Sequence, residues 1–433
     1  MSTKYAVALA AFLLASTVVR GDEVTGGREL ERQATVATDA GDYPAATDLV
    51  SRALTLRPNH PGITYRLAKA AVRAGRLDAA IDALDDYAAL GMKADIEADP
   101  VLAPLANDPR MATVMAAFRR NAEPKGVATI EATIGEPQIL AEGIAFDPTS
   151  KRLYVGSVHK RKVIALDPRA TERDFVASSS HGLLGVFGMT LDPLVGSLWA
   201  ASSAVSQVGG AISPADKSRA GIFEFSTIDG ALKKKAVLPD DGKEHVVGDL
   251  VRTRRGDIFA GDSIAPNLYR LTANGSALEI FLTSDRFHSL QGLALSADDR
   301  RLAVADYAGG LLIVDIASRA VTPLPMPAHT TLHGIDGLMR YGRDLIAIQN
   351  GVDPQRVVRL RMNQSWTSVE GLDVMAANLA EISEPTLATI AGNDVLVIGN
   401  GQWERFADDG SVKGTEPFEP TRIVRVALPP SRP

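Results

Sequence analysis

The chain has 433 residues, of which 45% are hydrophobic and 23% are charged. This length exceeds that of a typical single domain and predicts two domains, with enough apolar residues for a core in each. The formal net charge is −6, and the densest basic run is the three lysines from Lys233 to Lys235. A nucleic-acid partner is therefore not expected, because its phosphates require a basic patch.

The first residues have the pattern of a secretory signal peptide. Lys4 precedes an apolar run that ends at Val19, and Gly21 provides a small residue for cleavage. We expect residues 1–21 to be removed and the mature protein to be exported, to a bacterial periplasm or the medium, with no membrane contact. The run is shorter than the about 20 residues of a membrane span, although an uncleaved anchor is the alternative. The absence of cysteine excludes disulfides and thiolate metal sites.

Residues 22–124 are expected to form an all-α domain that resembles tetratricopeptide repeats. Two helical segments can be aligned so that Gly41 matches Gly75, an offset of 34 residues, which is the period of this repeat. A third, degenerate segment over residues 92–118 is expected to cap the stack. Such repeats predict a concave surface for a protein partner. The alternative is that they shield one face of the neighbouring domain.

From residue 127 to 433 the pattern changes to short strands and predicts an all-β six-bladed propeller. Each unit begins with a short strand in which a glycine, or a residue in its place, follows a variable position. The six first strands are EGIAFDP, FGMTLDP, GDLVRTR, QGLALSA, DGLMRYG and EPTLATI. Gly143 and Gly188 are 45 residues apart, as are Gly292 and Gly337, which fits a blade of four strands.

The last unit lacks an outer strand of its own. We expect the segment from Val127 to Thr133 to supply that strand and so to close the ring without a covalent bond. Pro124 to Gly126 are expected to link the two domains.

The inner strands of a propeller line its central channel, and the residue before each glycine is expected at the mouth. These residues are Glu142, Phe187, Gly248, Gln291, Asp336 and, in the last blade, Glu384. Several oxygen-bearing side chains that converge there would suit a hard divalent cation such as Ca²⁺. The alternative is a hydrated polar channel without a tightly bound ion.

The segments AEGIAFDP, SLQGLALSADDRRLAVAD and HGIDGLMRYGRDLIAI resemble the senescence marker protein, gluconolactonase and luciferin-regenerating enzyme family. The resemblance covers most of residues 140–400. It implies that Glu142, Gln291 and Asp336 bind one divalent metal, usually calcium, and that Asp336 is the general base for opening a lactone. A metal at this position would polarise the carbonyl of a lactone or ester.

Three features depart from the family pattern. Gly248 and Asp249 replace an Asn-Asp pair, and Val246 stands where the family has a substrate-binding arginine. Gln291 replaces an asparagine. These changes put sugar-lactone hydrolysis in doubt but leave a ligand site at the same place, where we expect Asp249 and Phe187 to contact the ligand or its immediate neighbours.

Three histidines share one register in consecutive blades. His245, His288 and His333 each lie three residues before the mouth position, and His181 lies three residues further out in the second blade. Imidazoles that converge on the axis could ligate Zn²⁺ or act as acid–base groups. We therefore expect His333 and His288 to assist Asp336, with His245 and His181 around the substrate. The alternative is that each histidine caps its own loop.

Two functions follow from these features. The first is an exported, metal-dependent hydrolase or lyase that acts on a small ester or lactone at the channel mouth. The second is a non-catalytic scaffold that binds partners through the helical repeats and the propeller. Propellers host both classes of function, and the acidic and imidazole groups at one mouth favour the first.

Overall fold

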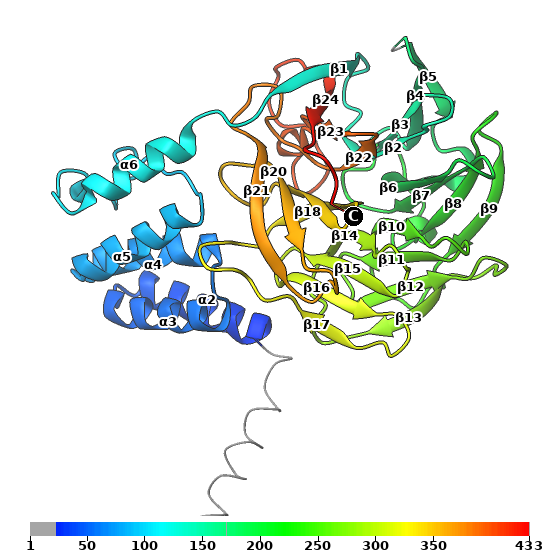
Figure 1. Ribbon diagram of the computed structural model, residues 1–433. Helices are drawn as coiled ribbons and strands as arrows, with labels where there is room; N and C mark the ends of the chain where they lie inside the picture. The colour runs from blue at the N-terminus through cyan, green and yellow to red at the C-terminus, as the bar shows by residue number, and fades with distance from the viewer. Residues whose placement is uncertain (1–22, 170, 433) are drawn as a thin grey trace, which may run out of the picture. The chain divides into compact units, whose positions relative to one another are not determined.

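The computed structural model describes residues 23–432 except residue 170 (Figure 1). The predicted signal peptide, residues 1–21, lies outside these described residues. None of the helices in the described part is long and apolar enough to cross a membrane. The described chain forms two compact units, one of residues 23–87 and 95–115, the other of residues 88–94 and 116–432.

The N-terminal part is helical, as predicted. Its elements are α2 (Glu23–Asp39), α3 (Tyr43–Leu56), α4 (Pro61–Arg73), α5 (Leu77–Ala89), the short 3₁₀ helix η1 (Ala103–Leu105) and α6 (Met111–Ala122). Helices α3 and α5 start 34 residues apart, in agreement with the predicted repeat. Gly41 and Gly75 precede them with φ of 76° and 72°, a conformation that glycine adopts without a steric penalty.

Small side chains let the helices of this part approach one another. Ala46 on α3 and Ala80 on α5 occupy equivalent repeat positions, and both are fully buried. Val50 and Leu84, one turn further along each helix, are also buried. The repeated positions therefore form the helical core, as close helix packing requires.

The second unit is a six-bladed propeller of antiparallel four-stranded sheets, arranged in order around a central axis (Figure 1). Blade one contains β2 (Ala141–Phe146), β3 (Leu153–Ser157), β4 (Lys162–Leu166) and β5 (Glu172–Val176). Blade two contains β6 (Gly185–Asp192), β7 (Ser197–Ser203), β8 (Ala220–Ser226) and β9 (Leu232–Val237). Blade three contains β10 (Val247–Arg252), β11 (Ile258–Asp262), β12 (Asn267–Leu271) and β13 (Glu279–Thr283).

The remaining blades follow the same order from the axis outward. Blade four contains β14 (Leu290–Leu295), β15 (Arg301–Asp306), β16 (Gly310–Asp315) and β17 (Val321–Pro323). Blade five contains β18 (Ile335–Tyr341), β19 (Asp344–Gln349), β20 (Arg356–Met362) and β21 (Val369–Ala377). Blade six contains β22 (Ala388–Ala391), β23 (Asp394–Ile398), β24 (Thr421–Ala427) and, as its outer strand, β1 (Ala128–Ile134).

Strand β1 closes the ring, as predicted. It pairs antiparallel with β24, with Ala128 opposite Val426 and Ile134 opposite Thr421. An ion pair between Arg425 and Glu131, at 2.9 Å, links the same two strands. Backbone hydrogen bonds therefore complete the last blade and leave no open edge between the first and last sheets.

The apolar core lies between neighbouring sheets. Ile144 and Val155 of blade one pack in one cluster with Leu396 and Ile423 of blade six. Comparable clusters lie between the other blades. Burial of these side chains holds adjacent blades together, and it fixes the distance between their inner strands.

Glycine recurs in the inner strands because neighbouring blades meet closely at the axis. A Cβ atom at Gly143 would lie 1.9 Å from the carbonyl oxygen of Phe187 in the next blade. A Cβ atom at Gly292 would lie 2.4 Å from the backbone nitrogen of Leu338. Both distances are below any van der Waals contact, so any other residue would push two inner strands apart.

We predict that Gly143→Ala lowers the free energy of unfolding by about 3 kcal/mol, because overpacking against backbone cannot be relieved by a rotamer change. Chemical denaturation followed by circular dichroism measures the effect. Gly135→Ala is the matched control, since a Cβ atom there meets nothing within 4 Å. Equal stability of the two variants would contradict the steric account of the motif.

Candidate functional site

A cavity of about 440 Å³ lies where the inner strands begin. Every residue expected at the channel mouth lines it: Glu142, Phe187, Gly248, Gln291, Asp336 and Glu384. Each comes from a different blade. The strand register of the propeller therefore brings residues from the whole length of the second unit to one site, which we call the acidic mouth.

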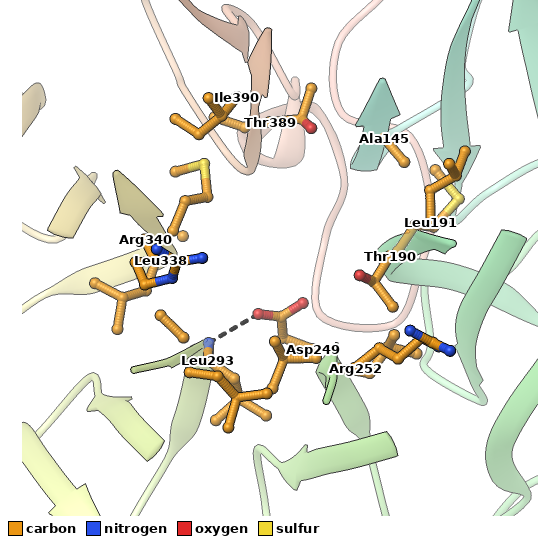
Figure 2. A pocket seen from close by; sticks show the side chains of 18 of the residues that line it. Ala145, Thr190, Leu191, Asp249, Arg252, Leu293, Leu338, Arg340, Thr389 and Ile390 are labelled. Atoms are coloured by element: carbon orange, nitrogen blue, oxygen red, sulfur yellow. Dashed lines mark hydrogen bonds between the residues drawn. The ribbon is translucent and has the colours of Figure 1, made fainter. Parts of the chain in front are cut away.

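A second cavity of about 470 Å³ lies at the other end of the same strands and is drawn in Figure 2. Its walls come from later positions of the inner strands, such as Thr190, Leu293 and Leu338. Asp249 and Leu387 line both cavities. The carboxylate of Asp249 thus lies between the two ends of the channel.

Blade three places a carboxylate where other blades have glycine. Gly248 occupies its mouth position, and Asp249 takes the place that Gly188 and Gly292 fill in the flanking blades. A Cβ atom at Gly188 would lie 2.2 Å from Oδ1 of Asp249, so this glycine is what makes room for the carboxylate. Oδ2 of Asp249 accepts a hydrogen bond of 2.9 Å from the backbone N–H of Leu293 (Figure 2).

Glu142 is held by a tryptophan from the other end of the unit. The indole Nε1 of Trp403 donates to Oε2 of Glu142 at 2.7 Å. Trp403 begins a short 3₁₀ helix, η4 (Trp403–Arg405), in the long connection between β23 and β24. This hydrogen bond fixes the orientation of the carboxylate and joins blade one to blade six.

Asp336 is held by a chain of polar groups. The amide Nδ2 of Asn350 donates to Oδ2 of Asp336 at 2.7 Å and to the carbonyl of Pro385 at 3.0 Å. The hydroxyl of Tyr307 donates to Oδ1 of Asn350 at 3.2 Å. Asn350 therefore fixes one oxygen of Asp336 and links blades five and six.

Gln291 presents an amide between blades three and four. Its Nε2 donates to the hydroxyl of Ser289 at 3.3 Å, and its Oε1 lies 3.5 Å from the hydroxyl of Ser263. A Cβ atom at Gly248 would lie 2.4 Å from that same hydroxyl. Glycine at this mouth position therefore preserves the contact between Ser263 and Gln291.

The acidic mouth concentrates negative charge. Four carboxyl groups, those of Glu142, Asp249, Asp336 and Glu384, line it, and among the described residues its lining contains no Lys, Arg or His. Burial raises the pKa of Glu142 well above its ordinary value, and the charge of Asp336 raises it further. Burial also raises the pKa of Glu384. These shifts agree with a mouth whose described lining offers its carboxylates no positive partner.

The pKa values of Asp249 and Asp336 are both raised to near neutral pH. Burial raises the pKa of Asp336 to about 7, although the hydrogen bond from Asn350 opposes the shift. Burial likewise raises the pKa of Asp249 to about 7, against the hydrogen bonds from the backbone N–H groups of Leu293 and Leu250. Perturbed carboxyl groups in a cleft are typical of ligand-binding and catalytic sites.

The donor chemistry of the mouth fits a hard divalent cation. Carboxylate and amide oxygens from Glu142, Asp336 and Gln291 are the ligands that Ca²⁺ prefers. Within the part of the chain that the structure describes, no three His, Asp or Glu side chains are grouped closely enough to hold a metal ion. A cation would thus need the amide oxygen of Gln291, backbone oxygens or water in addition to carboxylates.

The histidines do not line the acidic mouth. Nδ1 of His245 lies 2.6 Å from Asp262, and its Nε2 lies 3.1 Å from Asp241. Burial opposes protonation of His245, but the hydrogen bonds to these aspartates leave its pKa raised. Both ring nitrogens are therefore engaged within blade three.

The other histidines of the series also contact their surrounding loops. Nδ1 of His333 lies 3.1 Å from the carbonyl oxygen of Ala308. The backbone N–H of His288 donates to Asp306 at 2.6 Å, and the carbonyl of His181 accepts from Lys235 at 3.0 Å. The acid–base and metal-binding roles expected for these histidines stay predictions. The contacts described here are of the kind expected if each histidine caps its own loop.

Several residues of the mouth were not assigned to it from the sequence. They are Ser263, Tyr307, Asn350, Gln355, Thr386 and Trp403. Asn350 and Tyr307 each follow the second strand of a blade, β19 and β15, where side chains that form turns or pack are expected. Trp403 lies outside the repeated strands, and its one signal is the unusual length of the connection between β23 and β24.

Three comparisons relate the chain to known proteins. The family model for the tetratricopeptide repeat matches residues 37–103. No curated protein matches the chain. Among solved structures, a gluconolactonase from Xanthomonas campestris is 15% identical, with a TM-score of 0.46, and the match covers 71% of this chain and 99% of that one.

Two further solved structures match the chain at similar levels. A luciferin-regenerating enzyme is 13% identical, with a TM-score of 0.46, over 71% of this chain and 98% of that one. A regucalcin from Agrobacterium tumefaciens, described as a calcium-binding protein, is 13% identical, with a TM-score of 0.46, over 70% and 96%.

We predict that Asp249→Asn stabilises the protein more at about pH 8 than at about pH 5, by about 2 kcal/mol in the free energy of unfolding. A carboxyl group with a raised pKa in the folded chain contributes stability at low pH. That contribution is lost as the pH rises through about 7. The asparagine variant does not titrate and escapes this loss.

Chemical denaturation measures the free energy of unfolding at the two pH values. The buffer contains a chelator, so that no bound cation compensates the charge of Asp249. Asp285→Asn, at an exposed carboxylate, is the control and should show no comparable pH-dependent difference. An equal effect of Asp249→Asn at both pH values would contradict the assignment of this titration to Asp249.

Proposed function

We propose that the acidic mouth binds one divalent cation, most readily Ca²⁺, and hydrolyses a small lactone or ester. The observation that carries this proposal is the gathering of four carboxyl groups, that of Glu142 buried and the other three half-buried, without a basic partner in the described lining. Such uncompensated charge is relieved by a cation. The cavity volume of about 440 Å³ is within the range of small-molecule sites.

Glu142, Asp336 and Gln291 would hold the cation. A divalent cation at this position supplies Lewis-acid polarisation of the substrate carbonyl. The indole of Trp403 orients Glu142, and Asn350 orients Asp336, so both carboxylates are preorganised by hydrogen bonds of 2.7 Å. Phe187 provides an apolar wall against which the ring or chain of a substrate can lie.

Asp336 is the candidate general base. One of its oxygens accepts the hydrogen bond from Asn350, and the other remains to take a proton from an attacking water. Its pKa of about 7 is well matched to proton transfer near neutral pH. Asp249 lies deeper in the channel and adds to the negative charge of the mouth. Its hydrogen bond from the backbone N–H of Leu293 holds it away from the entrance.

The proposed export of the mature chain is consistent with this chemistry. A chain without cysteine can fold equally in an oxidising compartment, and calcium sites of modest affinity are common in extracellular proteins. Cleavage after residue 21 is tested by the N-terminal sequence of the protein recovered from an expressing cell.

We predict that Glu142→Gln and Asp336→Asn each weaken Ca²⁺ binding at least about tenfold. Asp336→Asn should also lower kcat/KM for a lactone or aryl ester at least about 100-fold, because the general base is lost. Calorimetry on chelator-treated protein measures the first effect, and a pH-stat assay over a panel of small lactones and esters measures the second.

Glu279→Gln, at an exposed position on the outer strand β13, is the matched control and should change neither property. Calcium binding without hydrolysis of any lactone or ester would refute the enzymatic part of the proposal. Hydrolysis that persists in Asp336→Asn would refute the role of this residue. Lack of any bound divalent cation would refute the metal site.

A second candidate function rests on the tetratricopeptide match over residues 37–103. The helical unit has its own groove of about 330 Å³ between α2, α3 and α4, and Arg66, Lys69 and Arg73 line it. Arg66 and Lys69 are paired with Glu31 and Asp99, whereas Arg73 lies over the ring of Tyr43. We propose that this groove binds an acidic peptide segment of a partner.

We predict that a short glutamate-rich peptide binds the full chain and that Arg73→Gln weakens this binding at least about fivefold, since it removes a cation from the groove. Fluorescence anisotropy measures the affinity. Arg52→Gln, at an exposed position of α3 outside the groove lining, is the control. Equal losses in both variants would indicate general electrostatic attraction and contradict a specific groove.

A further inference from the structure

A groove of about 770 Å³ lies on the propeller at the turns that follow the inner strands of blades four and five. The turn after β14 contributes Arg300, and the turn after β18 contributes Arg343. Ser296 and Arg340 line both this groove and the cavity drawn in Figure 2, so the two are adjacent. The groove therefore lies on the face of the propeller opposite to the acidic mouth.

Positive charge dominates this groove. Five arginines and two aspartates line it: Arg300, Arg301, Arg340, Arg343, Arg432, Asp298 and Asp315. Such a surplus of guanidinium groups is unusual for a chain whose formal net charge is −6. The groove is thus a local region of positive potential on an acidic protein.

No carboxylate of the described residues forms an ion pair with Arg340 or Arg343. Arg301 forms none either, but it lies opposite Asp315 on the neighbouring strand β16, and the two charges attract each other. In contrast, Arg432 is paired with Asp344 at 2.6 Å and with Glu370 at 3.1 Å. The guanidinium of Arg340 donates to a backbone carbonyl, that of Gly342, at 3.1 Å.

Arg343 carries a donor that the described chain does not satisfy. Its Nε atom is shielded from solvent and has no hydrogen-bond partner in the structure. Its backbone is fixed on both sides, because its N–H donates to Arg432 and its carbonyl accepts from the indole of Trp366 at 2.8 Å. Arg343 is thus held in place at the groove, where it adds to the positive charge of the lining.

We propose that this groove binds a ligand that bears a multiply charged phosphate group. Guanidinium groups form forked hydrogen bonds to phosphate oxygens, and Arg340 and Arg343 of blade five line this groove together with Arg301 of blade four. A dianion also compensates more of the surplus charge than a monocarboxylate would. The volume of the groove accommodates a molecule larger than phosphate alone.

The phosphate could belong to a free small molecule or to a lipid headgroup, and two measurements distinguish these sources. Calorimetry of the full mature chain with inorganic pyrophosphate tests the free ligand. Co-sedimentation with phosphatidylglycerol vesicles, against phosphatidylcholine vesicles, tests the lipid. We expect saturable, one-to-one pyrophosphate binding that weakens at least about tenfold in Arg340→Gln and in Arg343→Gln.

Arg255→Gln is the matched control, because this exposed arginine belongs to the turn after β10 and lines neither cavity of this face. Thermal unfolding shows whether each variant is folded, and Arg340→Gln, at an exposed position, should be as stable as the wild type. Vesicle binding that depends on Arg340, without pyrophosphate binding, would assign the phosphate to a lipid. Absence of both, or an equal loss in Arg255→Gln, would overturn the proposal.

Discussion

The close approach of six inner strands at the axis is the constraint on which the rest of the second unit depends. Gly143 and Gly292 allow backbone to meet backbone between neighbouring blades. Because the strands come so close, the residue before each glycine is delivered to the same small mouth. Closeness also buries the carboxyl groups, and burial is the main cause of their raised pKa values. The close approach of the inner strands therefore determines both the packing around the mouth and the raised pKa values of its carboxyl groups.

Charge is distributed unevenly between the two ends of the channel. Carboxyl groups line the mouth, whereas arginines line the other end. Of these, Arg252 and Arg254 form ion pairs with aspartates, and Arg340 forms none with the described residues. Asp249 lies between these regions, in a position that glycine leaves empty in the flanking blades. The cation site and the phosphate site that we propose therefore lie on opposite faces of the propeller.

The sequence predicted the fold because its signals are local and repeated. Gly41 and Gly75 mark the helical period, and the six first strands mark the blades, so the strand order and the closing role of β1 could be predicted. The convergence of Glu142, Gln291 and Asp336 followed from the same register. Trp403 and Asn350 could not be predicted, because their contacts with these carboxylates join segments far apart in the chain. The shared register of the histidines carried no information about side-chain direction, which for His245 is set by Asp262 and Asp241.

The pairing of β1 with β24 has a consequence for biosynthesis. The first strand of the unit is made early, but its partner is the last strand to be made. Blade six therefore forms after the other blades are complete, and until then β1 has an unpaired edge that is open to wrong partners. Trp403 belongs to the same late blade and reaches Glu142 in the first. The hydrogen bond that orients Glu142 can therefore form only after blade six has folded, and in a truncated chain that lacks this blade the carboxylate is not held in place.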